Sequence, residues 1–170
     1  MKQLYLLLIL ISLKGLSQSN PFKTLDYDKV VAYEFKGDGE QKIKNCLKND
    51  QSKISKSIIL SKAQISRIES AITSKSSFGN RTMSCFDPHF ALVYYKNDMI
   101  KATVDICLQC NSLQSSIEIP ATKLTFTQLT DEYSVPNEGF SKQTRKDIYD
   151  FCEHLGFTKY LKPLNSFYDD

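Results

Sequence analysis

Residues 85–110 read CFDPHFALVYYKNDMIKATVDICLQC, and this stretch decides the fold because it predicts a β-hairpin. Residues 90–95 are an unbroken apolar and aromatic run, which is typical of a strand. Asn97 and Asp98 tolerate the left-handed backbone of a tight turn. From residue 99 the chain alternates, which indicates a second strand with one face on a core. The expected core face holds Ile100, Ala102, Val104, Ile106 and Leu108, and the opposite face holds Lys101, Thr103, Asp105 and Gln109.

A two-residue turn at Asn97 and Asp98 also predicts which residues lie opposite one another. The expected pairs are Tyr95 with Ile100, Val93 with Ala102, Ala91 with Val104, His89 with Ile106 and Cys85 with Cys110. A bulge would shift this register by one residue and exchange the faces, and Pro88 cannot donate to a ladder. In either register four side chains meet at the open end of the hairpin, namely Cys85, His89, Cys107 and Cys110.

The remaining chain predicts further strands and two amphipathic helices. Strand candidates are residues 29–35, 57–60, 113–119 and 124–129. Ser61 and Gln64 have the capping-box spacing of a helix that places Ile65, Ile68 and Ile72 on one face. Ser141 begins a second helix, and Gly156 is a suitable C-terminal stop.

Between these elements, residues 41–57 leave two alternatives open, a short helix around residues 43–47 or a loop. We find no internal repeat and no linker. We therefore expect a single α+β domain over residues 18–170. It should consist of an antiparallel sheet of four to six strands with two amphipathic helices packed on it.

Residues 1–17, MKQLYLLLILISLKGLS, predict a secretory signal peptide. Lys2 supplies the positive start, the apolar stretch is too short to span a bilayer, and Gly15 and Ser17 suit cleavage. We expect the domain to be exported, to the periplasm or the medium, with no membrane attachment after cleavage. The chain has 22 Lys+Arg and 19 Asp+Glu, so removing Lys2 and Lys14 leaves 20 against 19, a net charge of +1. This balance does not favour a nucleic-acid partner.

The chain has five cysteines, and the hairpin end allows three interpretations of them. The leading one is a disulfide staple, since export favours disulfides, and the predicted register makes Cys85–Cys110 the natural pair. An odd count leaves at least one cysteine outside such a pair. Cys46 is the candidate for an exposed or intermolecular thiol, and Cys152, on the apolar face of its helix, is a candidate core residue.

The second interpretation is a structural metal site. Three thiolates and one imidazole make a Cys3His set suited to zinc, formed by Cys85, His89, Cys107 and Cys110. The third is thiol redox chemistry by the C-x-x-C pair Cys107 and Cys110. Such pairs act at a helix N-terminus, whereas this one follows a strand. His89 has a simpler interpretation as a half-buried histidine bonded to backbone or to Asp87.

No catalytic constellation is apparent in the sequence. A Cys-His nucleophile pair needs the base within hydrogen-bond reach of the sulfur, and only a tertiary contact could bring His154 to Cys110. A phosphate-cradling glycine loop and a nucleophile elbow are both missing from the pattern. We therefore expect a non-catalytic binding or structural accessory domain, with a metal-binding or thiol-redox protein as the alternative. If Phe90, Leu92 and Tyr94 were exposed as an aromatic stripe, they would indicate a protein partner.

Five segments together resemble an uncharacterised family of small exported bacterial proteins. They are CFDPH at residues 85–89, CLQCN at 107–111, IEIP at 117–120, YDKVVAY at 27–33 and GFSKQTRKDIYDFCEHLGF at 139–157. The similarity covers most of the exported part. It implies a single-domain exported protein and adds no catalytic residue.

Overall fold

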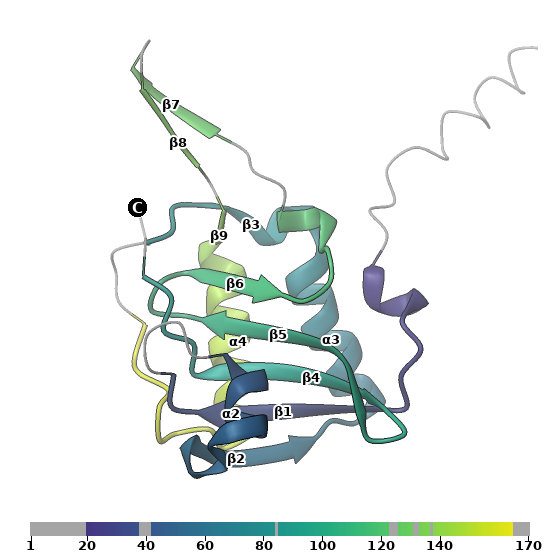
Figure 1. Ribbon diagram of the computed structural model, residues 1–170. Coiled ribbons are helices and arrows are strands. Elements are labelled where there is room, and N and C mark those ends of the chain that lie inside the picture. Colours follow the sequence, from purple (N-terminus) through teal and green to yellow (C-terminus); the bar gives the residue numbers. More distant parts are fainter. Residues whose placement is uncertain are drawn as a thin grey trace, which may run out of the picture.

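The computed structural model describes residues 20–37, 42–83, 85–122, 126–130, 133–136 and 138–164. The predicted signal peptide lies outside these ranges. The fold is α+β and single-domain, as predicted, with a five-stranded antiparallel sheet in the order β2-β1-β4-β5-β6. Figure 1 shows this sheet face-on. Its strands are β1 (Lys29–Phe35), β2 (Ile54–Ile59), β4 (Phe90–Lys96), β5 (Met99–Cys107) and β6 (Ser112–Ser115).

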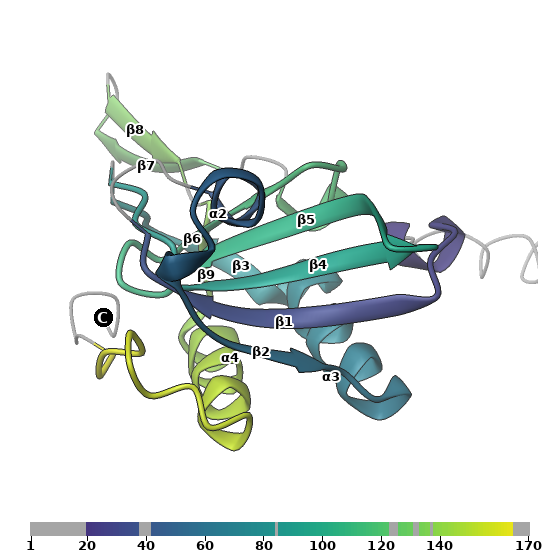
Figure 2. The same cartoon turned by 60° about the horizontal axis from the view of Figure 1, so that its bottom comes forward.

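Helices cover both faces of the sheet. The two predicted helices, α3 (Lys62–Thr73) and α4 (Lys142–His154), lie on one face, and α2 (Ile43–Asn49) lies on the other. Figure 2 shows the sheet between these two layers. Two further pairs of strands are β3 (Phe78–Asn80) with β9 (Gly139–Phe140), and β7 (Phe126–Thr130) with β8 (Tyr133–Pro136). Within the described ranges, no helix is both long enough and apolar enough to cross a membrane.

Central strand β4 is buried on both faces, which explains its unbroken apolar run. Phe90, Leu92 and Tyr94 belong to the core cluster under α3 and α4, so they form no exposed aromatic stripe. The alternate residues Ala91 and Val93 belong to a second cluster under α2. A strand covered on both sides needs apolar residues at every position rather than at alternate ones.

The hairpin turn is confirmed, but the predicted register holds only next to it. Asn97 and Asp98 have φ of 49° and 61°, and Tyr95 lies opposite Ile100. A bulge at Lys101 then shifts the pairing. The observed pairs include Tyr94 with Ala102, Leu92 with Val104 and Phe90 with Ile106. The predicted pairs of Val93 with Ala102, Ala91 with Val104 and His89 with Ile106 are therefore wrong. The bulge brings the apolar faces of both strands to the α3 and α4 side.

Helix α2 settles the alternative left open for residues 41–57 and overturns the prediction for Cys46. Ile43 and Cys46 are fully buried against the sheet, so Cys46 is not an exposed thiol. The amide of Ile43 donates a hydrogen bond of 2.7 Å to Asp105 Oδ1 at the start of this helix. The sequence pattern predicts that Thr103 and Asp105 lie on the polar face of β5. Helix α2 covers this face, and both side chains are buried.

The two longer helices form as predicted. Ser61 Oγ accepts from the Gln64 amide at 3.3 Å, and Gln64 Oε1 accepts from the Ser61 amide at 2.9 Å, which completes the capping box. Ser141 caps α4 by accepting from the Thr144 amide. Gly156 follows α4 with a φ of 67°, the left-handed conformation that glycine adopts without strain.

Candidate functional site

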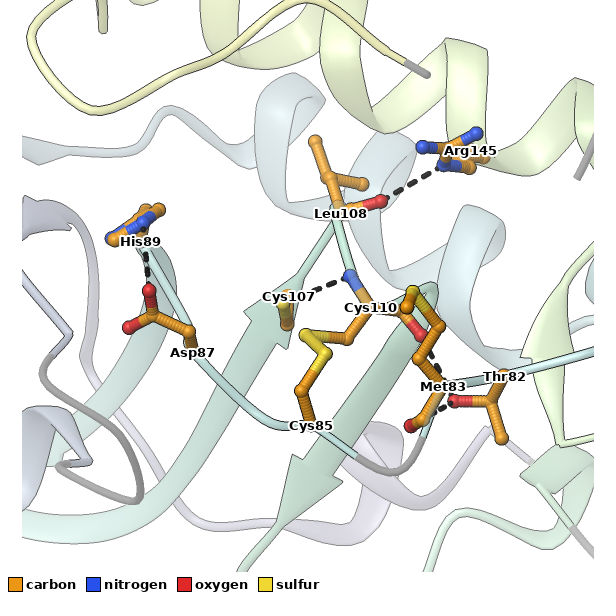
Figure 3. The surroundings of a disulfide bond; sticks show 9 residues. All are labelled: Thr82, Met83, Cys85, Asp87, His89, Cys107, Leu108, Cys110 and Arg145. Atoms are coloured by element: carbon orange, nitrogen blue, oxygen red, sulfur yellow. Dashed lines mark hydrogen bonds and ion pairs between the residues drawn. A yellow bond between two sulfur atoms is a disulfide. The ribbon is translucent and has the colours of Figure 1, made fainter. Parts of the chain in front are cut away.

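The open end of the hairpin is joined by a disulfide between Cys85 and Cys110, the pair that the sequence favoured. Their Cα atoms are 5.9 Å apart, within the range that a disulfide spans. The bond ties the segment before β4 to the turn after β5 (Figure 3). The two halves differ in access, because Cys85 is exposed while Cys110 is only 2% exposed.

Hydrogen bonds hold the same two segments together beside the disulfide. The carbonyl oxygen of Cys110 accepts from Thr82 Oγ1 at 2.9 Å and from the Met83 amide at 3.1 Å. Asn111, which has a φ of 54°, donates from Nδ2 to the carbonyl oxygens of Arg81 and Phe140. These bonds fix the chain before Cys85 against the turn that carries Cys110.

Helix α4 supports the turn from the core side. Arg145 is almost fully buried, and its Nε donates a 2.9 Å hydrogen bond to the carbonyl oxygen of Leu108 (Figure 3). A buried guanidinium needs such acceptors because an unpaired charge in the interior is costly. The position of the Cys85–Cys110 end therefore depends on α4 as well as on the hairpin.

Cys107 is a buried free thiol next to this disulfide, with an exposed fraction of 1%. Its Sγ accepts a hydrogen bond from the Cys110 amide at 3.1 Å, and the Asp87 and Gln109 amides also bond to it. Burial raises the pKa of the Cys107 thiol, while these backbone hydrogen bonds lower it in part. Cys107 is therefore a thiol that accepts hydrogen bonds from backbone amides and stays protonated at neutral pH.

His89 lies on the approach to β4, and each of its ring nitrogens has a neighbour. Nε2 is 3.5 Å from Asp87 Oδ2, while Nδ1 is 3.2 Å from the Phe35 carbonyl oxygen and 3.3 Å from the Gly37 amide nitrogen. The ring also stacks on Tyr160. In Figure 3 the imidazole points to Asp87 rather than to the three sulfur atoms. This matches the simpler interpretation of His89, a half-buried histidine with backbone and Asp87 partners.

The structure brings the four predicted ligands to one end of the hairpin but not into a metal-binding arrangement. In the part of the chain that the structure describes, no group of three or more His, Cys, Asp or Glu side chains is placed to hold a metal ion. Zinc binds cysteine as the thiolate, and Cys85 and Cys110 are joined to each other. A Cys3His zinc centre would therefore require reduction of this disulfide and movement of His89.

The remaining candidates lie elsewhere. Cys152 is fully buried in the core, as predicted, and burial raises the pKa of its thiol. His154 is exposed at the end of α4 and bonds to the Asp150 carbonyl. Cys110 is joined to Cys85, so it offers no free thiol for a Cys110–His154 nucleophile pair.

A cavity behind His89 is too small for an organic ligand. It measures about 20 Å³ and is lined by Glu34, His89, Cys152 and Tyr160, among others. Glu34 is buried and accepts from the Tyr160 amide at 2.9 Å, so the segment after α4 closes this space. Such a volume has room for about one water molecule.

Replacing His89 with alanine is expected to lower the free energy of unfolding by about 1–2 kcal/mol, because the ring loses its hydrogen bonds and the contact with Tyr160. The Cys85–Cys110 bond should remain, since the imidazole contacts Asp87, Tyr160 and the backbone of Phe35 and Gly37 instead. Urea denaturation and intact mass before and after reduction measure the two quantities. A variant that lost bound metal or changed its disulfide content would contradict the structural role of His89.

The site also includes a groove that sequence reasoning missed. It has a volume of about 460 Å³ and lies beside the disulfide, with Met83, Cys85, Phe86 and Leu113 among its lining residues. Met83 is 45% exposed. Residues 81–89 have no periodic pattern, and Leu113 comes from β6, so no local signal marks this groove.

Comparisons with known proteins do not assign this chain to a family. No family model matches the chain, and it has no significant match to a curated protein or to a solved structure. The similarity of its motifs to small exported proteins therefore stays a prediction from the sequence.

Proposed function

We propose that this chain is an exported, non-catalytic domain that binds a protein partner through the groove beside the Cys85–Cys110 disulfide. The observation that carries the proposal is the exposed side chain of Met83 in that groove. Methionine adapts its shape to different apolar partners, and an exposed apolar group inside a concave surface is typical of an interaction site. The expected partner is a polypeptide that inserts an apolar side chain.

The groove is pre-organised, which favours binding. Met83 is held through its amide to the Cys110 carbonyl oxygen, and the disulfide fixes the chain two residues later. A surface that is already ordered loses less conformational entropy when a partner binds. The Cys85–Cys110 disulfide therefore also holds the proposed binding surface in place.

Export and the absence of catalysis are parts of the same proposal. The N-terminal pattern and a disulfide in a small domain both favour an oxidising compartment. The ring nitrogens of His89 face Asp87 and backbone groups rather than a nucleophile. Zinc binding by the four hairpin side chains is the weaker alternative, because the disulfide uses two of them.

Selection of a phage-displayed random peptide library on the oxidised chain tests the binding function. We expect peptides with a shared apolar residue. Their affinity should fall at least about tenfold with Met83→Asp, a loss of about 1.4 kcal/mol. Met99→Asp is the matched control, because Met99 is 58% exposed at the turn end of the same hairpin. Failure to select any peptide, or equal effects of the two variants, would contradict the proposed surface.

A further inference from the structure

Three sulfur atoms lie together at the end of the hairpin, and they differ in both bonding and access. Cys85 and Cys110 share the disulfide, and Cys107 is a thiol. Cys85 is exposed, whereas the other two are 2% exposed or less. A disulfide with one exposed and one buried sulfur beside a buried thiol places the two reactants of an internal thiol–disulfide exchange next to each other.

The position of Cys107 favours attack on one particular sulfur. Its Sγ is 3.1 Å from the amide nitrogen of Cys110, so it lies beside the residue that holds the buried end of the bond. In Figure 3 the dashed line from Cys107 Sγ runs to the backbone nitrogen of Cys110. The Cys107 thiol is therefore adjacent to Cys110, and attack on Cys110 Sγ would make Cys85 the leaving sulfur.

The product of such an attack fits the local backbone. Cys107 is the last residue of β5 and pairs with Ser112, so the intervening residues 108–111 form the turn between β5 and β6. Cys107 and Cys110 are only three positions apart, and the Cys110 amide nitrogen is already 3.1 Å from Cys107 Sγ. A Cys107–Cys110 bond can therefore form with little movement of the turn.

We propose that Cys85–Cys110 is an exchangeable bond and that Cys107 displaces Cys85 from it. The Cys107 thiol loses its proton, and its sulfur forms a bond to Cys110 Sγ. The Cys110–Cys85 bond breaks, and its electron pair leaves on Cys85 Sγ, which takes up a proton. One disulfide is exchanged for another, so no oxidant or reductant is consumed.

The exchange converts an exposed, bonded sulfur into an exposed thiol. Cys85 lines the groove beside Met83, so the new thiol is accessible at that surface. There it can attack the disulfide of an external molecule, forming a Cys85 mixed disulfide and releasing the other half as a thiolate. This site for disulfide-bearing molecules goes beyond the non-catalytic binding proposed above and does not depend on the apolar partner.

The rate of exchange should rise with pH. Burial raises the pKa of Cys107 and the nearby Asp87 carboxylate raises it further, while the amides of Cys110, Asp87 and Gln109 lower it. The thiolate is the attacking form. As long as the pH stays below that raised pKa, each unit of pH should increase the rate about tenfold.

Labelling of the oxidised, full exported chain with N-ethylmaleimide, in native buffer without reductant, tests the proposal. Peptide mapping after an acid quench identifies both the labelled cysteine and the surviving disulfide. In the wild type we expect label on Cys85 together with a Cys107–Cys110 disulfide. With Cys107→Ser, labelling of Cys85 should slow at least tenfold. Cys152→Ser should behave as the wild type, because Cys152 is buried in the core away from the turn.

The wild-type map decides the question even if a variant folds poorly. Cys46 and Cys152 are both buried, so their labelling reports global unfolding. Labelling of Cys85 well before these two supports exchange in the folded chain. Label on Cys107 with Cys85–Cys110 intact, or label on Cys85 only as fast as on Cys46 and Cys152, would overturn the proposal.

Discussion

Replacing Cys85 with serine is expected to lower the free energy of unfolding by about 3–4 kcal/mol under oxidising conditions. The disulfide joins residues separated by 25 positions. Opening this loop gives the unfolded chain more conformations, which stabilises the unfolded state relative to the folded one. Cys85 is exposed, so serine at this position leaves no cavity. Urea denaturation measures the change as a lower midpoint.

The control is the same comparison in the presence of a reductant, where the wild type loses the bond and the difference should disappear. A bond between Cys107 and Cys110 in the variant would close only a short turn and restore little stability. If the wild type and Cys85→Ser have the same midpoint in oxidising buffer, the staple does not stabilise the fold.

Replacing Asp105 with asparagine is expected to stabilise the protein at neutral pH by about 2–3 kcal/mol. Asp105 is 1% exposed under α2, and burial raises the pKa of its carboxyl to about 6, although the Ile43 amide and Lys42 favour the charged form. Asparagine can still accept the hydrogen bond from the Ile43 amide through its carbonyl oxygen. It therefore keeps the start of α2 fixed without burying a charge.

The sign of the pH effect follows from the direction of this shift. The pKa of Asp105 is higher in the folded chain than its ordinary value of 3.8. The folded state therefore holds the proton more tightly, and the stability that protonation contributes is full below about pH 4 and is lost as the pH rises through about 6. The difference between Asp105→Asn and the wild type should grow over this interval and then stay constant.

Urea denaturation of both proteins between pH 4 and 8 measures this difference. Asp98→Asn is the matched control, because Asp98 is exposed at the hairpin turn and pairs with Lys29 on the surface. Exposed ion pairs contribute little, so this variant should show no rise in stability across the interval. An Asp105→Asn curve parallel to that of the wild type would contradict the effect of burial on Asp105.

The elements that sequence reasoning placed well depend on short-range signals. Asn97 and Asp98 determine the hairpin turn by their own backbone preferences. Ser61 and Gln64 bond to each other's backbone within one turn of helix, so the start of α3 can be predicted from four residues. Convergence of Cys85 and Cys110 follows from the hairpin itself.

The features that sequence reasoning misplaced depend on helix α2, which covers one face of the sheet, and on the bulge in β5. Asp105 occupies a polar position in an alternating strand, and only the packing of α2 makes that position buried. Cys46 belongs to a polar, lysine-rich segment whose seven-residue helix is too short to show a clear apolar face. The apolar residues of β5 recur at every second position of the sequence without a break at Lys101. The sequence pattern therefore does not reveal the bulge or the shift in register.

Patterns among residues a few positions apart were enough to predict the class of fold, the hairpin, the two longer helices and the set of cysteines at the hairpin end. Packing of the whole chain was needed to establish which faces are buried, where His89 points, which hairpin cysteine remains a thiol and where the groove lies. These features depend on contacts between distant segments, such as Met83 with Cys110 and Ile43 with Asp105. The energies of these contacts depend on how the helices pack on the sheet, so no pattern of neighbouring residues in the sequence predicts them.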